Sequence, residues 1–207
     1  INPAYRRAEL EYALVKVGVK VLITAESFKT SNYLDMLADL IPELSNCRPE
    51  RLSASKFPLL NSIIQTGKLN QAGMFRFQDI MEKGGEGDKA RLVGIGRKLF
   101  PEESINLQFT SGTTGAPKVA TLTHTNIVNN ARFVAKSMQL THKDRLCIPV
   151  PLYHCFGMVL GNLACIVGGT TMVFPGEGFD PVDTLEALNA ERCTGVHGVP
   201  TMFSAML

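Results

Sequence analysis

The stretch Thr110-Ser111-Gly112-Thr113-Thr114-Gly115-Ala116-Pro117-Lys118 is the segment around which the rest of this sequence is organised. Its side chains are small, hydroxyl groups and glycines predominate, and it ends in a lysine. Residues 105–109 before it and 119–123 after it have the composition of short strands, which predicts a loop between two extended segments. Glycines let backbone N–H groups turn toward a ligand, hydroxyls add donors, and a lysine neutralises an anion. The sequence therefore predicts a cradle for a polyphosphate.

This loop differs from the common Walker A loop, which reads G-x-x-x-x-G-K-[ST] and leads into a helix. Two residues, one of them Pro117, separate Gly115 from Lys118. Val119 follows the lysine, where a Walker loop places the hydroxyl that holds magnesium. On composition alone, a Ser/Thr/Gly-rich surface turn is the alternative interpretation.

The bulk composition is that of an ordinary globular protein. The 207 residues are 45% apolar and 19% charged, with a net charge of +2. A chain of this length can bury a core as one domain or as two small ones. Because there is no basic excess, we expect no nucleic-acid partner.

Cysteine usage argues against a disulfide framework and against a metal site. The five cysteines are an odd number without a C-x-x-C pair, which favours free thiols, and we expect no metal ligands. His154 beside Cys155 does not change this expectation, because adjacent residues of one chain rarely point at a common centre.

Residues 156–174 carry no charge and are long enough to span a bilayer. Gly157 and Gly161 also match the small-residue spacing of membrane helices. However, Gly168 and Gly169 divide the run, and no aromatic belt or basic cluster flanks it. We expect a buried helix followed by a buried strand, and no transmembrane segment.

The order of the predicted elements indicates an α/β fold with layered, mostly parallel sheets flanked by helices. We predict one α/β segment over residues 1–81, an exposed connector over 82–104, and a second α/β segment over 105–207 that carries the loop. In the connector, Gly85-x-Gly87-x-x-Ala90 formally fits the dinucleotide fingerprint, but we reject it because no strand precedes it. Helices are predicted over 5–17, 31–44, 77–81, 124–140, 157–167 and 181–193 and from Pro200 onward. Strands are predicted over 19–24, 59–64, 105–109, 119–123, 146–150, 170–174 and 194–199.

Three residues are predicted to cap helices. Gly18 suits the end of the first helix, and Thr123 and Asp180 suit the starts of later ones. His124 is interpreted as a structural residue at the start of its helix. The buried stripe of this helix is predicted to comprise Ile127, Ala131, Val134 and Met138.

The nine-residue loop resembles the phosphate-loop signature of the adenylate-forming enzymes, which include acyl-CoA synthetases, luciferases and the adenylation domains of peptide synthetases. Residues 149–157 (PVPLYHCFG) resemble the second core motif of this family, and residues 198–202 (GVPTM) resemble a segment near its acyl pocket. The resemblance covers essentially the whole chain and is to a portion of the family's large N-terminal domain. The branch it looks most like is the medium-chain fatty acyl-CoA synthetases, including the mitochondrial family member 2 type.

The resemblance implies a two-step reaction. A carboxylate attacks the α-phosphate of ATP to give an acyl-adenylate and pyrophosphate, and the thiol of coenzyme A then displaces AMP. Because the first step brings two anions together, it depends on charge neutralisation and alignment more than on a strong base. The implied ligands are ATP, Mg²⁺, coenzyme A and a fatty acid. The implied location is intracellular: cytoplasmic in a bacterium, with the mitochondrial matrix as a candidate in a eukaryote.

The resemblance also assigns residues to these ligands. His154 would line the acyl or pantetheine channel, with a satisfied core histidine as the alternative, and we assign no other catalytic candidate. The remaining channel candidates are Phe156, Gly198, Val199, Pro200 and Thr201. In the loop, Gly112 and Gly115 would allow the backbone to approach the phosphates closely, and Pro117 would stiffen the exit of the loop. Mg²⁺ would bridge the β- and γ-phosphates. The residues that would hold these phosphates are Thr110, Ser111, Thr113, Thr114 and Lys118.

Val119 departs from the family pattern, which places glycine directly after the loop lysine. If the position needs a conformation that only glycine reaches easily, valine would strain the loop exit by about 1–3 kcal/mol. If it is an ordinary strand position, a β-branched residue fits and nothing is lost. We predict modestly weaker ATP affinity than in a Val119→Gly version of the full-length enzyme.

The resemblance further implies that the adenine, ribose and hinge motifs and the C-terminal catalytic domain follow Leu207 in a longer protein. We therefore expect residues 1–207 alone to show no turnover, and pyrophosphate release by this segment would contradict that. The alternative functions are an aryl-CoA ligase, a luciferase-like enzyme, an amino-acid adenylation enzyme, or a non-catalytic nucleotide-binding relative.

Overall fold

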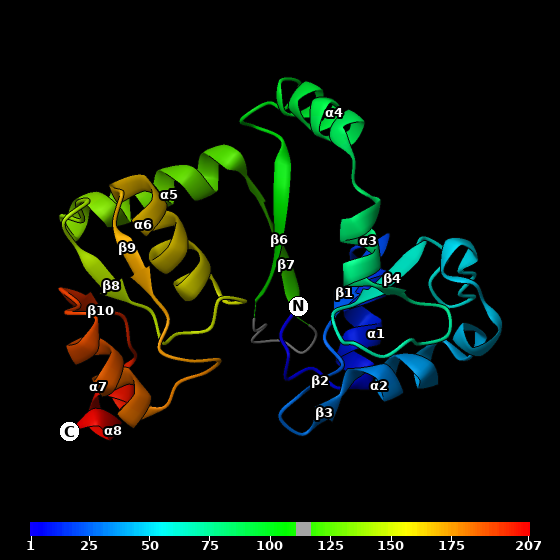
Figure 1. Ribbon diagram of the computed structural model, residues 1–207, viewed down its shortest axis with the longest axis horizontal. Helices are drawn as coiled ribbons and strands as arrows, with labels where there is room; N and C mark the ends of the chain where they lie inside the picture. Colours follow the sequence, from blue (N-terminus) through cyan, green and yellow to red (C-terminus); the bar gives the residue numbers. More distant parts are fainter. Residues whose placement is uncertain (111–116) are drawn as a thin grey trace. The chain divides into compact units, whose positions relative to one another are not determined.

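The computed structural model describes residues 1–110 and 117–207 (Figure 1). The chain divides into two units, Ile1–Leu99 and Phe100–Leu207. Each unit contains a three-stranded parallel sheet accompanied by helices. The predicted α/β class with mostly parallel sheets is confirmed.

The first unit is built on a parallel sheet with the strand order β1-β4-β5. Its strands are β1 (Val21–Thr24), β4 (Ser62–Gln65) and β5 (Phe75–Arg76), and β2 (Ser27–Phe28) pairs with β3 (Ser31–Asn32) as an antiparallel ribbon. Its helices are α1 (Arg7–Lys16), α2 (Tyr33–Leu40), α3 (Phe77–Lys83) and α4 (Glu86–Gly96), with 3₁₀ turns η1 (Pro42–Asn46) and η2 (Pro49–Arg51).

Helix α1 ends at the predicted glycine. Gly18 has a φ of 61°, and its N–H donates to the carbonyl of Val15 at 3.2 Å. The N–H of Val19 donates to the carbonyl of Leu14 at 3.1 Å. Together these bonds form a Schellman motif, which satisfies carbonyls at the end of the helix.

The prediction of a single helix over 31–44 is wrong in its extent. Helix α2 stops at Leu40, and η1 follows from Pro42. Proline disfavours the α conformation at the residue before it, and Ile41 has a φ of −132° and a ψ of 74°. The chain therefore leaves the α-helix one residue before Pro42.

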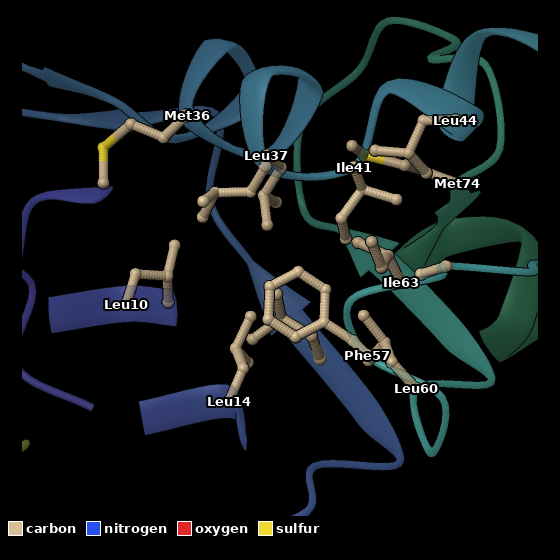
Figure 2. Close-up of a cluster of buried hydrophobic side chains, with 13 residues drawn as sticks. Leu10, Leu14, Met36, Leu37, Ile41, Leu44, Phe57, Leu60, Ile63 and Met74 are labelled. Atoms are coloured by element: carbon tan, nitrogen blue, oxygen red, sulfur yellow. The ribbon is translucent and has the colours of Figure 1, made fainter. Parts of the chain in front are cut away.

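Buried apolar side chains from α1, α2, η1 and β4 form the core of the first unit (Figure 2). Figure 2 shows Leu14 of α1 and Leu37 of α2 on opposite sides of the Phe57 ring. Burying an apolar side chain of this size stabilises a fold by about 1.5–3 kcal/mol. None of the candidate site residues comes from this unit.

The connector predicted over 82–104 is exposed along its whole length and contains α4. The N–H of Gly85 donates to the Asp88 carboxylate at 3.1 Å, which stabilises the start of this helix. The preceding element is α3, not a strand. Rejection of the dinucleotide fingerprint at Gly85 is therefore confirmed.

The second unit combines an antiparallel ribbon with a parallel sheet of order β10-β8-β9. The ribbon pairs β6 (Ser104–Thr110) with β7 (Lys118–Thr123), and the sheet contains β8 (Arg145–Cys147), β9 (Thr171–Val173) and β10 (Gly195–Val196). Its helices are α5 (His124–Ser137), the π-helix η3 (Phe156–Leu163), α6 (Ala164–Gly168), α7 (Pro181–Ala190) and α8 (Pro200–Met206). Helix α5 packs along η3 and α6, and α7 packs against α8 (Figure 1).

Both predicted N-caps of this unit are confirmed. The Thr123 hydroxyl accepts from the N–H of Asn126 at 3.1 Å, and the Asn126 side chain accepts from the N–H of Thr123 at 3.0 Å. The Asp180 carboxylate accepts from the N–H groups of Val182 and Asp183. Each cap is worth about 1 kcal/mol to its helix.

The buried stripe of α5 was predicted correctly at its start and wrongly at its end. Ile127 and Ala131 are buried, and the next buried residue is Ala135 rather than Val134 or Met138. Residues four apart follow one ridge of a helix, so 127, 131 and 135 face the same neighbours. His124 is the first residue of α5, as expected.

The predicted α-helix over 157–167 is instead a π-helix that continues into α6. Gly157 and Gly161 let η3 approach its neighbours, because they carry no side chain. Within the described residues, none of the helices combines the length and the apolar content needed to cross a membrane. A helix followed by a strand in this run is confirmed by η3, α6 and β9, but the expectation of a buried strand is wrong, because Thr171 and Met172 are exposed.

Candidate functional site

The loop predicted to hold phosphates joins the two strands of the β6–β7 ribbon. Its residues 111–116 lie outside the described part of the chain, so their role stays a prediction. Its ends are defined, because Thr110 is the register partner of Lys118, and Phe109 that of Val119. Lys118 is exposed where β7 begins. The structure therefore places a cationic side chain at the mouth of the predicted cradle.

Val119 occupies an ordinary strand position. It pairs with Phe109 in the antiparallel ribbon, and the described non-glycine residues with positive φ are Lys29, Gln139 and Arg192. The strained alternative for Val119 is therefore wrong, since a β-branched residue suits an extended conformation.

The expected effect of Val119→Gly changes accordingly. Without strain to relieve, the substitution is expected to leave the Kd for ATP within about twofold, and to weaken the ribbon by about 0.5–1 kcal/mol because glycine is more flexible in the unfolded chain. Isothermal titration of the full-length protein with ATP measures the affinity. A Kd at least about tenfold lower in the glycine variant, equal to about 1.4 kcal/mol, would restore the strained interpretation.

His154 sits in the turn before η3, and its ring is fixed by the backbone. Its Nδ1 accepts from the N–H of Phe156 at 3.1 Å. The neutral ring then carries its proton on Nε2, which is free to donate to a ligand. His154 is exposed, so the alternative of a buried core histidine is wrong.

The side chains of His154 and Cys155 do meet, although the sequence argument expected adjacent residues to point apart. The Cys155 Sγ lies 3.7 Å from Nδ1 of His154. This nitrogen already accepts from the backbone N–H of Phe156, so it is not available to deprotonate the thiol. The contact does not make a nucleophile pair.

Two channel candidates meet through a third residue. The ring of Phe156 lies 5.0 Å from the ring of His197, with an angle of 60° between their planes. Gly198 follows His197 and packs against Phe203. A Cβ added to Gly198 would lie 3.0 Å from the Phe203 ring. The turn at His154 and the segment after β10 thus come together at Phe156.

The remaining channel candidates form the start of α8. Val199 precedes the helix, Pro200 is its first residue, and Thr201 follows it. All three are exposed. They are therefore accessible to a ligand, and the proposed contact with an acyl chain stays a prediction.

The cysteines differ in burial, with Cys147 and Cys165 buried, Cys155 exposed, and Cys47 and Cys193 intermediate. Burial raises the pKa of Cys147 to about 11, with a further contribution from the Cys193 thiol beside it, and burial alone raises the pKa of Cys165 to about 11. Cys155 is exposed. Among the described residues, His, Cys, Asp and Glu side chains form no group of three that could hold a metal ion.

Alkylation is expected to follow this division. Iodoacetamide near pH 8 should modify Cys155 much faster than Cys147 and Cys165, because the thiolate is the reactive form and both buried thiols stay protonated. The raised pKa of these two thiols also affects stability. Because it lies above the ordinary 9.0, the two protonated thiols contribute to the stability of the folded state below about pH 9. This contribution to stability is lost as the pH rises toward 11. Peptide mass spectrometry measures the order of modification, and equal rates in the native protein would contradict it.

Comparison with known proteins gives a consistent result. A model of the family described as AMP-binding enzyme matches residues 1–207. The mitochondrial medium-chain acyl-CoA ligase ACSF2 of Danio rerio is 43% identical over 209 residues, and the acyl-CoA ligase SID4 of Ajellomyces capsulatus is 41% identical over 212 residues. Both alignments cover 100% of this chain and 34% of the relative, so the chain spans about a third of the length of these relatives.

A solved structure shows the same fold. The anthranilate CoA ligase AuaEII, in complex with anthranoyl-AMP, superposes with a TM-score of 0.75 at 21% sequence identity. The superposition covers 99% of this chain and 35% of that chain.

Proposed function

The chain belongs to the AMP-binding enzyme family, and from this premise we propose that the full-length protein is an ATP-dependent, AMP-forming carboxylate–CoA ligase. The observation that carries the proposal is the match of the family to every residue of the chain, including the loop 110–118. Relatives that are 43% and 41% identical are named acyl-CoA ligases, which supports this reaction class.

In this proposal the loop holds the β- and γ-phosphates of ATP. Lys118 neutralises phosphate charge from the start of β7, and the backbone and hydroxyl groups of residues 110–115 donate hydrogen bonds. Holding the outer phosphates fixes the α-phosphorus in line with the incoming carboxylate, so the loop contributes alignment and charge neutralisation.

Mg²⁺ fits this arrangement as a cation that arrives with ATP. Magnesium in nucleotide sites is held largely by the substrate phosphates and water, with one or two carboxylates. Its chemistry would be to neutralise charge on the phosphates.

We propose a medium-chain fatty acid as the carboxylate and coenzyme A as the acceptor. The Danio rerio relative is named a medium-chain ligase and mitochondrial, which supports this substrate class and makes the mitochondrial matrix a candidate location. The Nε2–H of His154 would donate to the acyl or pantetheine carbonyl, since Nδ1 is occupied by the backbone. Phe156 and residues 198–201 would line the channel beside it.

The products of the full-length protein test this function. With ATP, Mg²⁺, octanoate and coenzyme A, we expect AMP, pyrophosphate and octanoyl-CoA in equal amounts by liquid chromatography and mass spectrometry. Formation of ADP and phosphate would contradict the proposal. Binding of ATP without turnover, across carboxylates of different length, would instead support the non-catalytic alternative.

A further inference from the structure

The hydrogen bonding at the C-terminal end of the π-helix η3 differs from that of an α-helix. At the end of η3 the N–H of Ala164 donates to the carbonyls of Val159 and Gly161. In an α-helix this N–H would donate to the carbonyl of Leu160, four residues earlier. π-Helical turns are uncommon and occur often at functional sites, so the group that stabilises this one is of interest.

His197 donates a hydrogen bond to the carbonyl of Leu160 from another element. Its Nε2 lies 3.0 Å from the carbonyl oxygen of Leu160, and the carbonyl can only accept, so Nε2 carries the hydrogen. His197 is 8% exposed, which places this hydrogen bond away from bulk water. The backbone N–H of His197 donates to the carbonyl of Cys147 at 2.9 Å, which anchors the residue to β8.

The same imidazole ring also contacts the start of η3. The ring centroids of His197 and Phe156 are 5.0 Å apart. A single side chain therefore touches η3 at its first residue and, about one turn later, at Leu160.

We propose that His197 is a positioning residue that keeps η3 in its π-helical form and thereby sets which length of acyl chain the channel accepts. This inference rests on the proposed ligase function, in which Phe156 lines the channel. A π-helical turn has more residues per turn than an α-helical one, so return to α-helical hydrogen bonding rotates residues at one end of η3 relative to the other. Loss of the His197 donor would therefore move Phe156 and change the space beside it.

Substitutions at His197 in the full-length protein separate the donor from the ring volume. His197→Leu removes the donor, and His197→Gln retains an N–H at a similar distance from the backbone. His197→Asn keeps an amide that is too short to reach, and serves if the leucine variant does not fold. His142→Leu is the matched control, because His142 is exposed and lies in the same unit.

Two measurements are made on each variant. Hydrogen–deuterium exchange of residues 156–168 reports the hydrogen bonding of η3 and α6 without requiring activity. The kcat and KM for saturated carboxylates of four to twelve carbons report the channel. In His197→Leu we expect faster exchange in this segment and a change of about tenfold in the relative kcat/KM of short and medium chains, the scale of one lost buried hydrogen bond. The KM for ATP should stay within about twofold, and His197→Gln and His142→Leu should resemble the wild type.

The outcomes distinguish this inference from the proposed function. If the wild type is active but His197→Leu has the exchange and chain-length profile of the wild type, the inference is wrong and the ligase function stands. If His197→Gln behaves like His197→Leu, the donor is not the cause and the inference is also wrong. If the wild type forms no acyl-CoA from any carboxylate, the proposed function fails, and the specificity role fails with it.

Discussion

Replacing Lys118 by methionine is expected to lower kcat/KM for ATP by about 10- to 100-fold, because a hydrogen bond to a charged group contributes about 1.5–3 kcal/mol. Lys118 is exposed at the start of β7, opposite Thr110. No ion pair within the described part of the chain engages it, so its charge is available to a ligand. Methionine retains much of the side-chain length and removes the charge. The change therefore tests phosphate neutralisation more than packing.

The effect of Lys118→Met should be specific for ATP. Steady-state rates of the full-length protein with ATP and carboxylate varied in turn would show a loss in kcat/KM for ATP with the KM for carboxylate little changed. Lys143→Met is the matched control, because Lys143 is also an exposed lysine of the second unit. If both variants lost kcat/KM for ATP equally, Lys118 would not be part of the proposed phosphate site. The same conclusion would follow if the kcat/KM of Lys118→Met for ATP stayed within about twofold of the wild type.

Gly157→Ala is expected to destabilise the second unit by about 1–3 kcal/mol or more, the range for inserting atoms into a packed site. A Cβ at this position would lie 2.4 Å from the carbonyl oxygen and 2.7 Å from the carbonyl carbon of Pro151, and 3.0 Å from the carbonyl oxygen of Val150. These are backbone atoms, which cannot rotate away as a side chain can. The turn from Pro151 to Gly157 carries His154, so activity should fall along with stability.

Gly87→Ala provides the matched glycine substitution. Gly87 lies in α4, where a Cβ would meet nothing within 4 Å. Alanine is a better helix former than glycine by about 1 kcal/mol, so this variant should be neutral or slightly stabilised. Urea unfolding of the full-length variants, with hydrogen exchange over residues 150–160, measures both effects. Wild-type unfolding and exchange in Gly157→Ala would show that the close approach to Pro151 is not required.

Local signals in the sequence predicted local structure well. The caps at Gly18, Thr123 and Asp180 depend on residues within a few positions of each other, and all three are present. The extent of α2 was missed although Pro42 gave a usable signal, since the residue before proline rarely stays helical. The π-helical form of η3 was missed because it depends on neighbours that are distant in sequence.

The candidate site was predictable to a different degree at each position. The loop 110–118 was found from its residue types and from a family resemblance, and the structure adds the paired strands at its ends. The role of Val119 could not be decided from sequence, because it depends on the backbone conformation. His197 gave no signal at all. Its hydrogen bond reaches a carbonyl 37 positions away, and only the approach of the residue after β10 to η3 reveals it.

Transfer of ¹⁸O from a labelled carboxylate to AMP tests the central claim most directly. If the full-length protein forms an acyl-adenylate, one carboxylate oxygen becomes bonded to the α-phosphorus, and thiolysis by coenzyme A leaves this oxygen on AMP. With doubly ¹⁸O-labelled octanoate, ATP and coenzyme A, mass spectrometry should therefore find AMP that carries a single ¹⁸O atom. Unlabelled AMP accompanying octanoyl-CoA, or ADP in its place, would contradict activation through an acyl-adenylate.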